Sequence, residues 1–226
     1  MNTKFFSVDV SWDEKILKKR SHPQSVKILT TEFDEYIDKY DHDWDLYFSH
    51  IGDLFKNIPT ELVGKFDYKD DTWDYMAVYY RRRGMIAVVS EKVKNILEEL
   101  HVSETEYVLK SIKIQGYDKS YFLMFVPFIP DSEFIYPLSD FESLYKEGEF
   151  YNYTDREEMR EHLYTIYLRN VCLPLSYQER DIIMVQWSHG VFFSKRLVEA
   201  FIDNNVKGFE VTSQFKIRFS NDFIEE

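Results

Sequence analysis

Acidic and aromatic side chains are interleaved in two windows of the chain, and residues of these types at this spacing suit the binding of a positively charged molecule. Residues 32–53 hold eight acids against Lys39, a charge of −7, and residues 67–74 hold four acids against Lys69, a charge of −3. Carboxylates interleaved with tryptophan and tyrosine provide electrostatic steering and rigid anchors for a basic protein. The predicted partner-binding residues are Asp41, Asp43, Trp44, Asp45, Tyr47, Asp70, Asp71, Trp73 and Asp74.

Two other interpretations of these windows stay open at this point. A charged helix face whose aromatic residues turn inward would produce the same composition, because an amphipathic helix buries one side and solvates the other. A hydrolase that uses the carboxylates of residues 41–45 with a divalent ion is the second alternative. The acidic spacing there is similar to the start of a calcium loop, but Leu46 and Gly52 occupy the sixth and twelfth positions, where such a loop needs glycine and an acid. No metal site is therefore predicted.

The sequence contains no recognisable catalytic motif. It has no G-x-S-x-G segment and no glycine-rich phosphate loop, and its only cysteine, Cys172, lies in an apolar context that favours a buried, unreactive thiol. We therefore predict no catalytic residues and no cofactor, and a function in binding.

Composition narrows the class of partner. With 44% apolar and 30% charged residues the chain is expected to fold, and its net charge of −12 disfavours nucleic acid, which binds through lysine and arginine. A single cysteine, no apolar leader after Met1 and no long apolar run predict a cytoplasmic protein that binds no membrane.

An internal repeat organises the chain. Residues 85–108 and 191–211 each read as a strand, a serine at the start of a short amphipathic helix, a turn and a second strand, and Ser90 aligns with Ser194 at an offset of 104. Each copy follows another predicted strand, at residues 75–80 and 182–187, which indicates a hairpin. Residues 4–10 also resemble residues 120–130, so the duplication is expected to extend over the whole chain.

These elements predict an α+β fold with mixed or antiparallel sheets and flanking helices. Helices are also expected near residues 31–40, 50–57 and 155–169, the last from the capping-box spacing of Thr154 and Glu157. The predicted halves are residues 1–115, with the first copy of the repeat, and residues 116–226, with the second, either as two domains or as one compact domain.

The second copy, with the strand at residues 121–127 and Ser139-Asp140-Phe141 before it, resembles a family of bacterial immunity-type proteins of polymorphic toxin systems. The resemblance covers roughly residues 120–212 and implies an α+β fold that neutralises a toxin by tight binding, with no catalytic residues. The first copy departs from this pattern, with Glu104 at the position of Gly208. We therefore expect an immunity-like protein that binds a basic toxin domain. The alternatives are a carboxylate-based, metal-dependent hydrolase and a structural or oligomerisation module.

Overall fold

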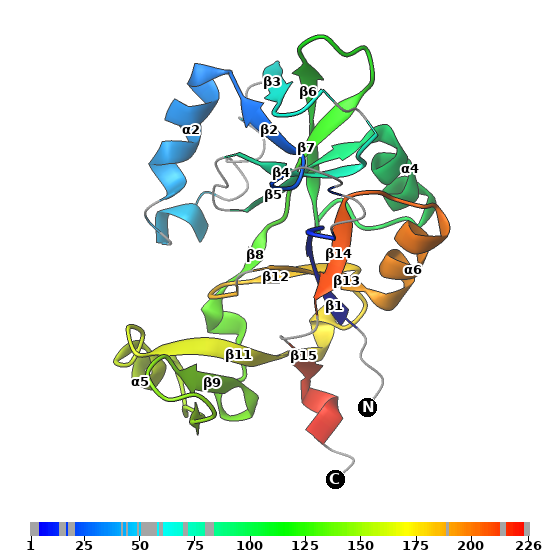
Figure 1. Cartoon of the computed structure of the whole chain (residues 1–226). Helices are drawn as coiled ribbons and strands as arrows, with labels where there is room; N and C mark the ends of the chain where they lie inside the picture. The colour runs from blue at the N-terminus through cyan, green and yellow to red at the C-terminus, as the bar shows by residue number, and fades with distance from the viewer. Residues whose placement is uncertain are drawn as a thin grey trace.

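The computed structural model describes residues 5–13, 17, 21–41, 43, 45–48, 50, 58, 61–69, 72–79, 84–188, 190–212 and 216–223. Three β-layers follow one another from top to bottom in Figure 1: a closed barrel, a five-stranded sheet and a four-stranded sheet. The prediction of an α+β fold with mixed and antiparallel sheets is confirmed.

The closed barrel has the strand order β2-β3-β6-β7-β5-β4. Helix α2 (Thr31–Asp41) packs on it through Phe33 and Ile37, and the Phe33 ring lies 6.2 Å from the ring of Phe125 in β7. Helix α4 (Glu91–Glu99) buries Val93, Ile96 and Leu97. The barrel strands are β2 (Ser25–Ile28), β3 (Leu62–Phe66), β4 (Tyr75–Val78), β5 (Met85–Ser90), β6 (Val108–Ile114) and β7 (Tyr121–Phe125).

Two strands of the five-stranded sheet, β12 and β13, are buried on both faces. Alternate residues of β12 enter different cores, with Ile182 in the core shared with the barrel and Ile183 in the core shared with the four-stranded sheet. Period-two alternation explains why β12 is apolar at every position and not only at every second one. The strand order of this sheet is β14-β1-β13-β12-β8, with β1 (Phe5–Val10), β8 (Phe128–Ile129), β12 (Ile182–Val185), β13 (Val191–Ser194) and β14 (Phe209–Thr212).

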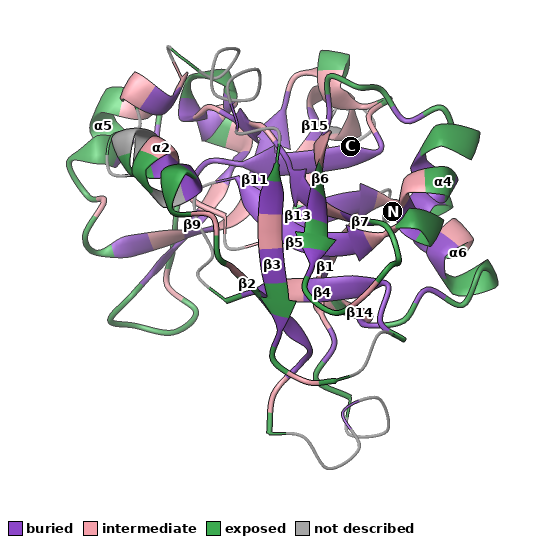
Figure 2. Cartoon of the chain, turned by 90° about the horizontal axis from the view of Figure 1, so that it is seen from above, coloured by how far each residue is buried: buried purple, intermediate pink, exposed green. Residues whose placement is uncertain are grey.

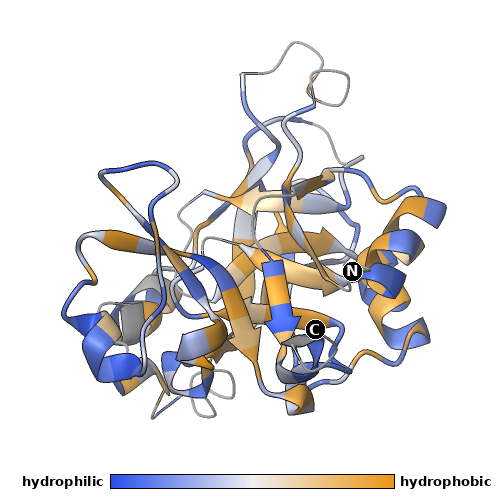
Figure 3. Ribbon diagram, turned by 90° about the horizontal axis from the view of Figure 1, so that it is seen from below, coloured by the Kyte–Doolittle hydropathy of each residue, from blue (hydrophilic) through white to orange (hydrophobic). Residues whose placement is uncertain are grey.

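The four-stranded sheet has the order β10-β9-β11-β15, and the four 3-10 helices of the described chain precede or follow its strands in the sequence. The buried residues concentrate in the strands, and the exposed ones lie on the outer sides of the helices (Figure 2). The hydropathy of the ribbon follows the same division (Figure 3). The remaining elements are β9 (Asp140–Ser143), β10 (Phe150–Tyr151), β11 (Ile166–Leu173), β15 (Lys216–Phe219), α5 (Arg156–Arg160), α6 (Lys195–Asp203), η1 (Asp131–Glu133), η2 (Tyr136–Leu138), η3 (Leu175–Tyr177) and η4 (Ser220–Phe223).

The helix expected over residues 155–169 is wrong in extent. Helix α5 ends at Arg160, and β11 begins at Ile166, in a segment rich in the aromatic and β-branched residues that favour strands. The cap is also shifted by one residue, because Asp155 Oδ1 accepts from the amide of Glu158 at 2.9 Å and the Glu158 carboxylate accepts from the amide of Thr154 at 2.8 Å. The helix near residues 31–40 is confirmed, and the one expected over residues 50–57 lies outside the described residues except His50.

The two copies of the repeat exchange their first strands. In the barrel, β7 lies between β5 and β6, and in the five-stranded sheet β1 lies in the same way between β13 and β14. The registers agree, since Phe122 is opposite Val89 and Phe6 is opposite Phe193, at the repeat offset of 104. Each half of the chain is therefore completed by a strand from the other half, which supports the predicted duplication.

This exchange changes how the halves can be divided. The boundary expected between residues 115 and 116 falls between β6 and β7, which pair along their length, and β1 lies in the sheet of the second half. A division at that boundary would therefore separate paired strands within the barrel, and it would not divide the barrel from the five-stranded sheet. The sequence offset between equivalent residues of the two copies falls from 104 to 102 in the last strand of each copy. Lys110 lies opposite Leu123 in the barrel, and at the equivalent place in the five-stranded sheet Thr212 lies opposite Ser7. A change of two residues keeps each side chain on its original face of the sheet.

Candidate interaction surface

Two of the aromatic residues predicted to anchor a partner belong to the core. Tyr47 is 0% exposed and its ring lies 5.8 Å from that of Phe128, and Trp73 is 3% exposed. Neither side chain is available to another molecule, so the prediction that they form a binding surface is wrong. Burial of their large apolar area stabilises the fold, so these rings lie in the core. This agrees with the alternative interpretation, in which the aromatic residues of the acidic windows turn inward.

Asp74 is also internal, and it joins the two halves. Its carboxylate accepts hydrogen bonds from Ser90 Oγ at 2.8 Å, from Lys92 Nζ at 2.9 Å and from the amide of Lys207 at 3.0 Å. The same residue donates its own amide to the carbonyl of Lys207 at 2.9 Å. A carboxylate with this many internal donors holds the start of α4 and the second half in place, which corrects its assignment to a binding surface.

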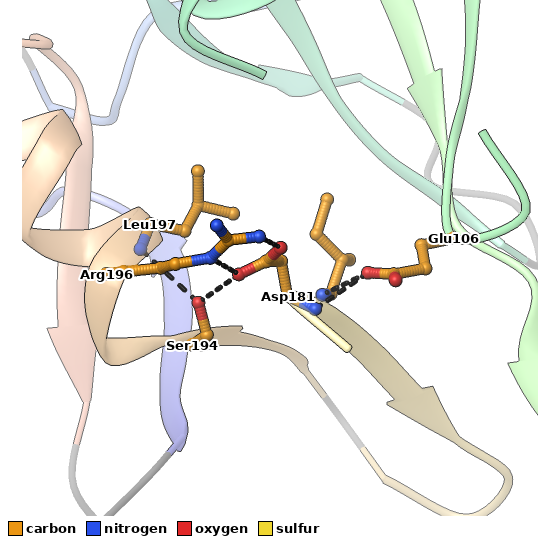
Figure 4. Close-up of polar contacts among 6 residues, drawn as sticks. Glu106, Asp181, Ser194, Arg196 and Leu197 are labelled. Atoms are coloured by element: carbon orange, nitrogen blue, oxygen red, sulfur yellow. Dashed lines mark hydrogen bonds and ion pairs between the residues drawn. The ribbon is translucent and has the colours of Figure 1, made fainter. Parts of the chain in front are cut away.

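The second copy contains an equivalent cluster (Figure 4). Asp181 is 3% exposed and accepts from Ser194 Oγ and from Arg196 Nε, both at 2.6 Å. Glu106 of the first half accepts the amides of Asp181 and Ile182 at 2.8 Å, in the role that the carbonyl of Lys207 has in the other cluster. Burial raises the pKa of Glu106, although the two amides act in the opposite direction. Lys207 of the second half thus binds the start of the β4–β5 hairpin, and Glu106 of the first half binds the start of the β12–β13 hairpin.

The remaining predicted residues divide into exposed and undescribed ones. Asp43 and Asp45 are exposed, and Asp43 caps the following turn by accepting the amide of Leu46 at 2.9 Å. Burial opposes the charge of Arg156, but the hydrogen bond to Asp131 raises the pKa of this guanidinium, and the charge of Asp45 adds a smaller contribution in the same direction. The structure describes only the helical backbone of Asp41, and Trp44, Asp70 and Asp71 lie outside the described residues. Among the predicted residues whose side chains the structure describes, only Asp43 and Asp45 are exposed, and no aromatic residue of the predicted set is exposed with them.

A cluster of large apolar side chains lies exposed elsewhere, on the β9–β10 hairpin and the turn before β11. The amide of Leu144 donates to the carbonyl of Thr165 at 2.8 Å, so the hairpin and the turn lie side by side. Scattered exposed apolar residues are ordinary, whereas several that gather in one hairpin and the turn beside it indicate an interaction site. Phe150 and Tyr151 are neighbours on β10, so they point to opposite faces of that strand. The hairpin surface, as we name it, consists of Leu144 (55% exposed), Tyr145 (77%), Phe150 (54%), Tyr151 (36%) and Tyr164 (90%).

Internal hydrogen bonds hold this hairpin in shape. Ser143 Oγ accepts the amides of Tyr145 and Lys146 at 3.2 Å, and the amide of Ser143 donates to the carbonyl of Glu149 at 2.9 Å. Glu142, on β9, accepts the amide of Gly148 at 2.9 Å and the hydroxyl of Tyr167. A loop ordered before binding loses less conformational entropy when it binds, which raises affinity.

The Glu142 carboxylate should make the order of this loop depend on pH. The hydrogen bond from Tyr167 and that from Gly148 lower the pKa of Glu142 below its ordinary value of 4.5. A carboxyl group with a lowered pKa in the fold stabilises the fold above its unfolded pKa, and this contribution is lost as the pH falls through the folded value. Amide exchange of Gly148 is therefore expected to quicken at pH values below 4.5, beyond its intrinsic pH dependence. In Glu142→Gln the exchange should show no such additional step, and an identical step in both proteins would assign it to other carboxyl groups.

The surroundings of the hairpin surface are acidic. Glu147, Glu157 and Glu161 are exposed, while the basic residues of α5 pair with a buried acid: Arg156 and Arg160 lie 2.8 and 3.6 Å from the carboxylate of Asp131. Figures 1 and 2 both place α5 on the same side of the molecule as α2, whose Glu32, Glu35 and Asp38 are also exposed. This side therefore combines negative charge with exposed aromatic area.

Asp131 is the anchor beneath this region. It is 0% exposed, its amide donates to Gln186 Oε1 at 2.9 Å, and its carboxylate accepts the indole N–H of Trp187 at 3.2 Å. Trp187 has a φ of +68°, a backbone conformation that is costly for a bulky residue and persists only where its surroundings impose it. These contacts fix α5, which at five residues is too short to be stable alone.

Other kinds of site find less support. Among the described residues, no three or more His, Cys, Asp or Glu side chains gather closely enough to hold a metal ion. Cys172 is buried, and burial raises the pKa of its thiol to about 11, so it remains protonated at neutral pH. No helix in the described part of the chain is both long and apolar enough to span a membrane.

The hairpin surface could have been recognised in the sequence. Residues 142–151, Glu-Ser-Leu-Tyr-Lys-Glu-Gly-Glu-Phe-Tyr, interleave acids with aromatics as the first window does, and they include a glycine where a hairpin turn needs one. No protein-family model matches this sequence, and no characterised protein matches it at a significant level.

Proposed function

We propose that this chain is a non-catalytic, immunity-like protein of the cytoplasm that neutralises a basic partner protein by covering it with the hairpin surface. The observation that carries the proposal is the exposure of Leu144, Tyr145, Phe150, Tyr151 and Tyr164 on a hydrogen-bonded hairpin and its neighbouring turn. The net charge of −12 supports a basic partner. The sequence resemblance to immunity-type proteins supports neutralisation as the purpose of binding.

The two features of the surface would have separate tasks. Aromatic residues near the centre of an interface supply most of the affinity, because they bury large area at low entropic cost. Charges at the rim raise the association rate and determine its dependence on salt. In this proposal Tyr145 and Phe150 provide affinity, whereas Glu147 and Glu161 attract the partner.

A substitution experiment tests the aromatic part of the proposal. The tagged chain would be used to isolate its partner from the native host, the partner would be identified by mass spectrometry, and the affinity of the purified pair would be measured. Tyr145→Ser and Phe150→Ser should each weaken binding about thirtyfold or more, as expected for truncated interface anchors. The matched control is Ile202→Ser, which removes an apolar side chain that is 58% exposed on α6, away from the hairpin. Equal affinities for all variants would reject the hairpin surface as the binding site.

The charged part has a kinetic signature. Glu147→Lys with Glu161→Lys should slow association and weaken its salt dependence, with little change in dissociation. Light scattering of the isolated chain tests the alternative that this protein is a structural or oligomerisation module. A stable homo-oligomer that Tyr145→Ser converts to a monomer would replace the proposal with an oligomerisation function.

A further inference from the structure

We infer that the hairpin surface recognises arginine side chains of its partner, through two neighbouring pairs of an exposed tyrosine and an exposed glutamate. The inference rests on the proposed function, and it specifies the chemistry of the partner's contact residues. The first pair is Tyr145 with Glu147, in the loop between β9 and β10, and the second is Tyr164 with Glu161, in the turn before β11.

The first pair has a free carboxylate because the loop's own cation is occupied. Lys146 Nζ lies 3.1 Å from Glu149, and Glu149 also accepts the hydroxyl of Tyr151 at 2.5 Å. Glu147 is exposed and forms no hydrogen bond or ion pair with the described part of the chain. The loop thus presents a tyrosine that is 77% exposed and a carboxylate that is still available to a foreign cation.

The second pair arises because the cations of α5 pair with a buried acid. Arg156 and Arg160 both lie within ion-pair distance of Asp131, whose carboxylate is 0% exposed, so part of their positive charge is neutralised inside the protein. Glu161 remains exposed, and among the described residues no cation lies within ion-pair distance of it. Tyr164, three residues further on, is 90% exposed.

The two pairs are adjacent, since the amide of Leu144 donates to the carbonyl of Thr165 at 2.8 Å. Two neighbouring subsites can engage two cations of one partner segment, and linked contacts bind more tightly than either one alone. Leu144, between the pairs, would lie under the apolar part of such a segment.

Arginine suits these pairs better than lysine for physical reasons. A planar guanidinium stacks on an aromatic face and can hydrogen-bond a carboxylate with two parallel N–H groups, whereas an ammonium is a strongly hydrated point charge. The chain uses both contacts internally: the guanidinium of Arg180 lies 4.6 Å from the centre of the Tyr177 ring, and Arg196 binds both oxygens of Asp181. The exposed pairs offer the same two contacts to a partner.

Two peptides of equal charge test the inference on the intact chain. One is a ten-residue peptide of alternating arginine and glycine, and the other has lysine in place of arginine. In NMR titrations, the arginine peptide should shift the resonances of Tyr145 and Tyr164 and should bind about two- to fivefold more tightly per subsite than the lysine peptide. The double variant Glu147→Gln with Glu161→Gln should bind the arginine peptide at least fivefold more weakly, while Glu91→Gln with Glu199→Gln, on α4 and α6, should bind it as the wild type does.

The possible outcomes separate the inference from the proposed function. Equal affinity for both peptides, shifts outside the two pairs, or no binding of either peptide would overturn the recognition of arginine. A natural partner whose binding still depends on Tyr145 and Phe150 would leave the docking function in place. If hairpin variants also bind that partner normally, the proposed function fails as well.

Discussion

Replacing Gly208 with alanine is expected to lower the free energy of unfolding by about 3–5 kcal/mol, the sum of overpacking and of a backbone conformation unfavourable to alanine. Gly208 has a φ of +100°, and a Cβ atom there would lie 2.2 Å from the carbonyl oxygen of Tyr75 and 2.6 Å from the Trp73 ring. In a chain of this length such a loss lowers the melting temperature by about 10 °C. Thermal unfolding followed by circular dichroism measures it.

Gly116 provides the matched control for this experiment. Its φ of +81° is also positive, but a Cβ atom there would meet nothing within 4 Å. Gly116→Ala should therefore cost only the backbone term, about 1–2 kcal/mol. If both variants lost the same stability, the close approach of the two halves at Gly208 would not be a principal constraint on the fold.

Replacing Asp131 with alanine is expected to cost about 3 kcal/mol, the lower end of the range for breaking a buried charge network. The carboxylate is 0% exposed, and its removal leaves Arg156, Arg160 and the indole of Trp187 without their acceptor. We choose the lower end because the side chains of Arg156 and Arg160 are 30% and 39% exposed, so water replaces part of the lost interaction. Urea unfolding measures the change.

The Asp131 variant should also affect α5 before it affects the rest of the fold. Amide exchange over residues 156–160 is expected to quicken more than exchange in β12 or β13, because α5 depends on this anchor. Glu147→Ala is the control, and its exposed side chain should change stability by no more than about 0.5 kcal/mol. A uniform increase in exchange throughout the chain would show that Asp131 stabilises the whole fold and not α5 in particular.

The contacts that each half makes with the first strand of the other half's hairpin explain a difference between the two copies of the repeat. In the second copy Gly208 lets the backbone approach Tyr75 closely, and the carbonyl of Lys207 accepts the amides of Asp74 and Tyr75. In the first copy the connection from helix to strand is longer, and the side chain of Glu106 reaches the amides of Asp181 and Ile182. A side chain spans the gap there, so the first copy does not need glycine at the position of Glu104.

Local pattern was sufficient to predict much of the fold. The repeat, the strands on either side of Ser90 and Ser194, and the helices that follow these serines are all encoded in nearby residues, because hydrophobic period and capping act over one or two turns. The α+β class follows from the same signals. The helix expected over residues 155–169 failed in extent because the cap, which forms at Asp155 one residue after the predicted position, begins a helix of only five residues, and the strand preference of residues 166–173 determined the rest.

Tertiary structure alone decided which acidic and aromatic residues face water. Tyr47, Trp73 and Asp74 belong to the same two chemical classes, aromatic and acidic, as Tyr145, Tyr164 and Glu147, yet the first three are buried and the last three are exposed. Composition cannot separate these sets, because burial depends on which strands pair across a hundred or more residues, as β1 does with β13 and β14. The sequence by itself determined the repeated units and their chemistry, and the exchange of strands between the halves determined which side chains remained on the surface.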